Sequence, residues 1–162
     1  MNQYPICSSN RKTYRPDLPA SPRYRLAVLS LALIGLTPLV IASLIQPNPS
    51  GLGSHRQLHL PPCGFYEQTG YPCPTCGMTT AFTYLVRGRF FHAFTVQPAG
   101  ALAALACLIF TTITTYSAFT ARRLDNLICW IALHRIHLII IGLTIFLLSW
   151  GWLCFMTWMR PS

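Results

Sequence analysis

Three long apolar runs dominate the chain, at residues 26–45, 99–119 and 138–158, and none of them contains Asp, Glu, Lys or Arg. A helix of about 20 residues, rising 1.5 Å per residue, is about 30 Å long, which matches the hydrocarbon thickness of a bilayer. Pro38 lies inside the first run, and membrane helices tolerate proline. The pattern therefore predicts three membrane-spanning helices.

The segments between these runs have patterns of their own. Residues 54–77 form a loop rich in Cys, Pro and Gly, and residues 78–96 place apolar side chains at helical spacing around Gly88. Such a segment, with charges on its other face, predicts one helix lying in the membrane interface. Residues 121–137 predict a short amphipathic helix on the cytoplasmic face. The fold class is thus an all-α membrane protein with three transmembrane helices and one interfacial helix.

The composition supports a lipid-facing exterior. Hydrophobic residues make up 52% of the chain and charged residues 9%, against about 25% charged in soluble domains. The net charge of +9 comes from 12 Lys and Arg against 3 Asp and Glu. These cations flank apolar runs without forming a basic face or a nucleic-acid motif, so we expect the lipid bilayer and a membrane-protein partner, and no nucleic acid.

The basic residues also predict an orientation. They are concentrated in residues 1–25, which we expect to be a disordered cytoplasmic tail, and in the connection at residues 121–137. This places the N-terminus in the cytoplasm and makes residues 26–159 a multi-pass membrane domain. The Cys-rich loop then faces the non-cytoplasmic side, although Arg87 and Arg89 put positive charge there as well.

The candidate reactive residues are the two thiols in the run Cys73-Pro74-Thr75-Cys76-Gly77. Two residues separate the thiols, so both sulfurs fit one tight turn or helix start. Pro74 fixes one φ angle, and Gly77 permits a sharp bend. A helix that begins near Cys76 would direct unpaired amides at the sulfurs, which favours thiolate.

This run resembles a family of small bacterial membrane proteins known as domain of unknown function 2752. The family pattern is Cys-Pro-x-Cys-Gly-x-Thr-Arg, with a later Gly and an Asn-Pro before the next helix. Cys73 to Thr79 fit the run, Gly88 fits the later Gly, and Gln97-Pro98 stands at the Asn-Pro position. Thr80 replaces the usual Arg. The resemblance covers about residues 60–120 and implies a bacterial inner-membrane protein in which Cys73 and Cys76 are important, without implying an activity.

Three roles fit the thiols. A disulfide could clip the loop into an interaction surface, which is a non-enzymatic role and the one that the sequence favours. In thiol–disulfide exchange, Cys73 would attack, Cys76 would resolve, and Cys63 would act as a shuttle. In the third role Cys63, Cys73 and Cys76, with His59 or His55, would bind zinc. No other cofactor is indicated.

Overall fold

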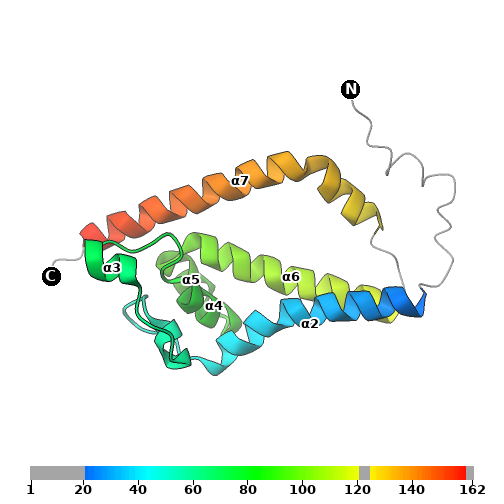
Figure 1. The fold of residues 1–162 in the computed structure, drawn as a ribbon, viewed down its shortest axis with the longest axis horizontal. Helices are drawn as coiled ribbons and strands as arrows, with labels where there is room; N and C mark the ends of the chain where they lie inside the picture. The colour runs from blue at the N-terminus through cyan, green and yellow to red at the C-terminus, as the bar shows by residue number, and fades with distance from the viewer. Residues whose placement is uncertain (1–20, 121–124, 160–162) are drawn as a thin grey trace.

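The computed structural model describes residues 21–120 and 125–159; these residues form helices joined by loops, with no strand among them (Figure 1). Three helices are long and apolar enough to cross a membrane, as expected of a multi-pass membrane protein. The predicted fold class is therefore confirmed. The elements are α2 (Pro22–Leu44), η1 (Ser54–Leu58), α3 (Gly64–Thr69), α4 (Met78–Val86), α5 (Phe90–Val96), α6 (Pro98–Thr120) and α7 (Asp125–Trp158).

Helix α2 begins earlier than the apolar run that marks it. Ser21 is the N-cap, and its Oγ accepts a hydrogen bond of 3.3 Å from the Tyr24 amide. Pro22 follows at the first helical position, where proline suits a helix start. The last residues of the tail expected over 1–25 are thus helical, and residues 1–20 lie outside the described part.

Helices α2 and α6 lie side by side over most of their length (Figure 1). Small residues make the close approach, since Gly35 of α2 lies against Thr111 of α6. A Cβ at Gly35 would stand 2.6 Å from Thr111 Oγ1. Cys107 Sγ also donates a hydrogen bond of 3.2 Å to the Gly35 carbonyl. Small residues of this kind let membrane helices pack backbone to backbone.

In place of the one helix expected over residues 78–96, the chain forms two. Helix α4 ends at Val86 and α5 starts at Phe90, because Gly88 takes a left-handed conformation with φ of 73°. Helix α4 packs against both α2 and α6. A Cβ at Gly100 of α6 would lie 3.1 Å from Met78 Cα, so this glycine admits the start of α4.

Arg87, just after α4, forms hydrogen bonds with carbonyls at the end of α2 and in α4. Its guanidinium donates hydrogen bonds to the carbonyls of Ala42 at 3.2 Å, Ser43 at 3.1 Å and Thr83 at 2.9 Å. The carbonyls in the last turn of a helix have no partner within the helix, and a cation there also suits the helix dipole. The sequence suggests Arg87 only as a positive charge on the outer face. In the structure it caps the C-terminal end of α2.

Helix α7 runs unbroken where a short helix followed by a crossing was expected. No Pro or Gly separates Asp125 from Ile141, so nothing in the sequence stops the helix. Its 34 residues make it about 51 Å long at 1.5 Å per residue. Helix α7 diverges from α6 toward its N-terminus (Figure 1), and the side chains over residues 130–144 are exposed.

Candidate functional site

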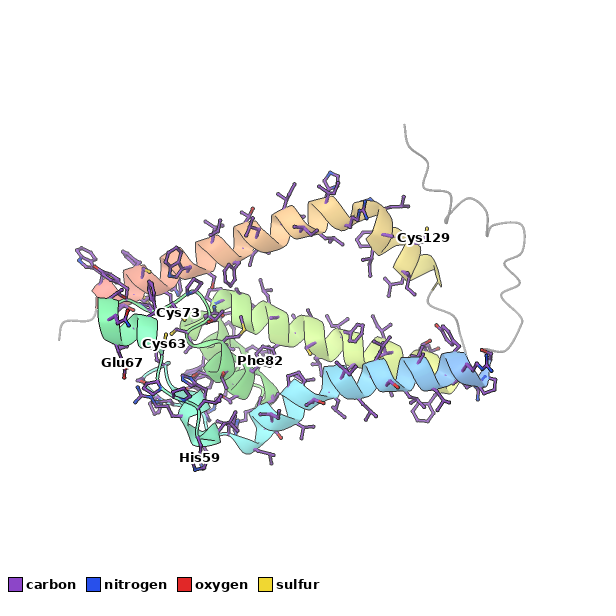
Figure 2. All side chains as sticks on the ribbon, in the orientation of Figure 1. His59, Cys63, Glu67, Cys73, Phe82 and Cys129 are labelled. Atoms are coloured by element: carbon purple, nitrogen blue, oxygen red, sulfur yellow. The ribbon has the colours of Figure 1, made fainter. Side chains whose placement is uncertain are left out.

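The loop before α4 brings three thiols together. The sulfurs of Cys73 and Cys76 lie 3.2 Å apart, and the Cys63 sulfur joins them so that all three lie within 4.8 Å of one another. Each of these cysteines is free and partly buried. The sequence predicts the pairing of Cys73 with Cys76 from their spacing, and Cys63 arrives from the start of α3 (Figure 2).

The backbone around the thiols forms a turn that ends at the start of α4. The Cys76 amide donates to the Cys73 carbonyl at 3.0 Å, and the Met78 amide donates to the Thr75 carbonyl at 3.2 Å. Gly77 is the N-cap of α4 with φ of 83°. A Cβ there would lie 3.2 Å from the Gly51 carbonyl. Glycine is thus required both by the conformation and by the close approach.

The two thiols of the turn have unequal pKa values. Burial raises the pKa of Cys73, but hydrogen bonds from Thr75, Cys76 and Cys63 outweigh it and lower the pKa to about 7. Burial, followed by hydrogen bonds with Cys73 and Cys63 and by the charge of Cys73, raises the pKa of Cys76 to about 12. Because the sulfurs interact, the two values describe the pair. Between about pH 7 and pH 12 the pair carries one negative charge, and the direction of the two shifts favours Cys73 as the thiolate.

The thiols line an open pocket of about 320 Å³, shared with His55, Met78 and Thr79. His55 belongs to η1, which a buried hydrogen bond of 2.8 Å between Ser54 Oγ and Thr80 Oγ1 holds against α4. Thr80 is 1% exposed. A small hydroxyl at this position therefore ties the two segments together.

His59 stands apart from the sulfurs. It is exposed at the end of η1, and Figure 2 shows it at the edge of the molecule, away from Cys63 and Cys73. It is also not among the residues that line the thiol pocket. Of the two histidines considered for a metal site, His55 is the one that the described structure brings to the pocket.

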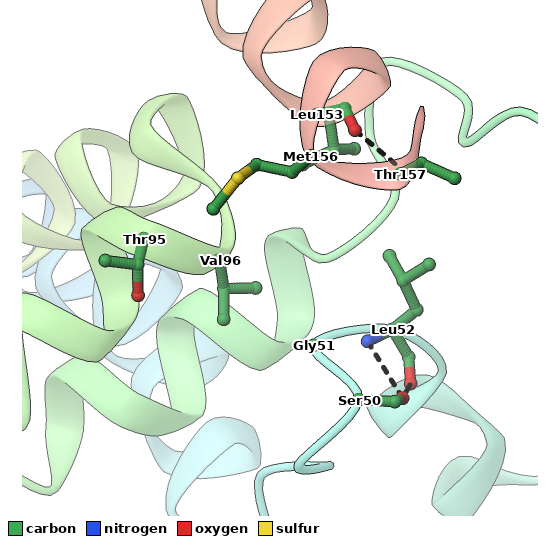
Figure 3. A pocket seen from close by; sticks show the side chains of 8 residues that line it. All are labelled: Ser50, Gly51, Leu52, Thr95, Val96, Leu153, Met156 and Thr157. Atoms are coloured by element: carbon green, nitrogen blue, oxygen red, sulfur yellow. Dashed lines mark hydrogen bonds between the residues drawn. The ribbon is translucent and has the colours of Figure 1, made fainter. Parts of the chain in front are cut away.

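A second hollow of about 280 Å³ lies behind the turn, where the loop, α5 and the end of α7 meet (Figure 3). Met156 and Leu153 of α7 face Leu52 and Val96 across it. A Cβ built on Gly77 would lie 3.3 Å from Val96 Cγ1 and 3.2 Å from the Gly51 carbonyl, so the thiol turn lies close to this hollow.

Comparison with known families matches one part of the chain. Residues 63–111 match the family described as "Protein of unknown function (DUF2752)". The resemblance inferred from the Cys-Pro-x-Cys-Gly run is therefore confirmed. The DUF2752 region runs from Cys63 to the middle of α6 and contains all three clustered thiols. No curated protein and no solved structure matches the chain.

Proposed function

We propose that this DUF2752-related protein carries out thiol–disulfide exchange from the non-cytoplasmic face of a bacterial inner membrane. The observation that carries the proposal is the 3.2 Å contact between two partly exposed, free sulfurs. A disulfide bond is about 2.05 Å long, so closure needs only a small movement within a tight turn. The pKa of about 7 at Cys73 supports the same reading, because thiolate is the reactive form.

The exchange needs a disulfide as oxidant, from a small molecule or a protein. The Cys73 thiolate attacks one sulfur of that disulfide, forms a mixed disulfide, and releases the other sulfur as a thiolate that takes up a proton. The charge on Cys73 is then gone, which removes one of the causes that raise the pKa of Cys76. Cys76 loses its proton, attacks the Cys73 sulfur, and releases the second thiol. The oxidant gains two electrons, and Cys73 and Cys76 become a disulfide.

Zinc binding is a second candidate, favoured by the third thiol. Zinc takes ligand sulfurs at about 2.3 Å in a tetrahedron, so sulfurs sit about 3.8 Å apart. The three sulfurs lie within 4.8 Å of one another, and His55 lines the same pocket. The three sulfurs could supply three of the four zinc ligands, and His55 is the candidate for the fourth, so that zinc would organise the loop as an interaction surface.

One experiment separates the three roles of the thiols. The purified full-length protein is equilibrated in glutathione buffers of increasing oxidised fraction, alkylated and weighed by mass spectrometry, and its zinc content is measured. Exchange predicts a Cys73–Cys76 disulfide that forms and opens within the glutathione range and is absent in Cys73→Ser. Cys107→Ser, in α6, should behave as the parent protein. One zinc per chain, lost in Cys73→Ser, would identify the metal centre instead. A disulfide that persists in every buffer would identify a structural clip.

The proposed orientation has a separate test. A membrane-impermeant maleimide applied to intact, reduced cells should label Cys73 if the loop faces the non-cytoplasmic side as proposed. Labelling that appears only after lysis would put the loop in the cytoplasm and reverse the orientation. The Cys73→Ser variant is the control for labelling at other cysteines.

A further inference from the structure

Cys73 lies between Pro72 and Pro74, and the carbonyls of both prolines need hydrogen-bond donors. Pro72 and Pro74 have no backbone N–H, so the turn lacks donors at both positions. Their carbonyls still accept, and buried carbonyls are paired in nearly all folded proteins. The nearby amides of Cys76 and Met78 donate to the Cys73 and Thr75 carbonyls, so neither serves the carbonyl of Pro72 or Pro74.

Two side chains from different helices supply those donors. Trp150 of α7 donates from Nε1 to the Pro72 carbonyl at 3.0 Å. Gln97, directly before α6, donates from Nε2 to the Pro74 carbonyl at 3.0 Å. The carbonyls that flank Cys73 are thus held from both sides by the ends of two membrane helices.

The Gln97 side chain is buried and is held in place by a second hydrogen bond. Its side chain is 0% exposed, and its Oε1 accepts a hydrogen bond from the Gly100 amide in the first turn of α6. The amide of Gln97 therefore joins the start of α6 to the turn that carries the thiols. Pro72 is also among the fully buried side chains, and its hydrogen bond with Trp150 is partly buried.

We propose that Gln97 and Trp150 are positioning residues that hold Cys73 beside Cys76 and thereby favour closure of their disulfide. The inference rests on the proposed exchange function. Sulfurs held 3.2 Å apart have little conformational freedom left to lose when the bond forms. If the hydrogen bonds to the turn are lost, the two thiols must be ordered when the disulfide forms. The dithiol form then becomes more stable relative to the disulfide form.

The test compares two tryptophans of α7 whose indole N–H groups bind carbonyls in different segments. Trp150→Phe removes the N–H that binds the Pro72 carbonyl and keeps an aromatic ring. Trp152→Phe is the matched control, because its Nε1 donates to the Thr95 carbonyl at 3.2 Å, away from the thiol turn. The readout is the equilibrium constant for closing Cys73–Cys76 in glutathione buffers, measured on the full-length protein.

For Trp150→Phe we expect this constant to fall about 3- to 10-fold, which makes the reduction potential about 15–30 mV less negative. Trp152→Phe should keep the parent value. Gln97→Met, which loses both bonds of the side chain, should show at least as large a fall if it folds. Equal constants in Trp150→Phe and the parent would overturn the inference, as would an equal fall in both tryptophan variants. If the parent protein itself does not cycle, the exchange function fails instead.

Discussion

Helices α2 and α7 meet the same partner, α6, in opposite ways. The most apolar window of each has a mean hydropathy of 2.3, yet 28% of that window is buried in α2 and 11% in α7. Helix α2 packs along α6 through small residues, whereas α7 is attached near its C-terminal end. There Ser149 Oγ accepts a hydrogen bond of 3.0 Å from the Ala99 amide, beside the Trp150 and Trp152 contacts.

The difference shows what drives contact between helices in lipid. Apolar side chains gain little by leaving lipid for protein, so hydrophobicity alone does not bring two membrane helices together. Close packing of small residues holds α2, and a few polar contacts hold α7. One of these contacts, from Trp150 to the Pro72 carbonyl, lies at the thiol turn, so the less buried of the two helices contacts that turn directly.

The largest expected effect comes from filling the close contact of α2 with α6. Gly35→Ala should lower the free energy of unfolding by about 1–3 kcal/mol, because its Cβ would overlap Thr111 Oγ1. Gly142→Ala in α7 is the matched control, since a Cβ there meets nothing within 4 Å. Thermal unfolding in the same detergent measures both. Equal stability of the two variants would show that α2 does not depend on close packing against α6 more than α7 does.

The next effect concerns the cap on α2. Arg87→Met should cost about 1–2 kcal/mol, because it leaves the carbonyls of Ala42 and Ser43 without their charged donor. Arg89→Met, at an exposed position two residues on, should cost less than about 0.5 kcal/mol. The same unfolding assay applies. A larger loss in Arg89→Met would show that the cap does not stabilise this corner.

The pH dependence of alkylation tests the thiol turn that α6 and α7 hold. The pKa of Cys73 is lowered to about 7, so its thiolate fraction reaches about half near pH 7 and levels off about one pH unit higher. Below pH 7 the rate should fall about tenfold per pH unit, equivalent to about 1.4 kcal/mol. The rate of iodoacetamide labelling at Cys73, followed by peptide mass spectrometry, gives the profile. A midpoint near the ordinary thiol value would contradict it.

The smallest effect should come from the attachment of α7. Ser149→Ala removes the acceptor of the Ala99 amide and should cost about 0.5–1.5 kcal/mol, the usual net value of one hydrogen bond. Thr144→Ala is the control, because its hydroxyl donates only to the Ile140 carbonyl of its own helix. A Ser149→Ala variant as stable as the Thr144→Ala variant would mean that other contacts hold α7.

The sequence predicts the crossings well, because an uncharged run of sufficient length has few alternatives to lying in lipid. It does not predict the break at Gly88 or the continuity of α7, since helical periodicity marks a face and leaves the ends of a helix open. The spacing of Cys73 and Cys76 predicts their contact. The roles of Gln97, Trp150 and His55 depend on segments distant in sequence, although the Gln97-Pro98 pair before α6 is a visible signal.

The central claim is that Cys73 attacks a disulfide and Cys76 resolves the product. It is tested most directly by trapping the mixed disulfide with oxidised glutathione in a Cys63→Ser background, so that the third thiol cannot interfere. With Cys76→Ser added, glutathione should remain attached to Cys73. With Cys73→Ser added instead, Cys76 should carry at least tenfold less, because burial raises its pKa. Equal adducts on both variants, or none on Cys73, would contradict the account.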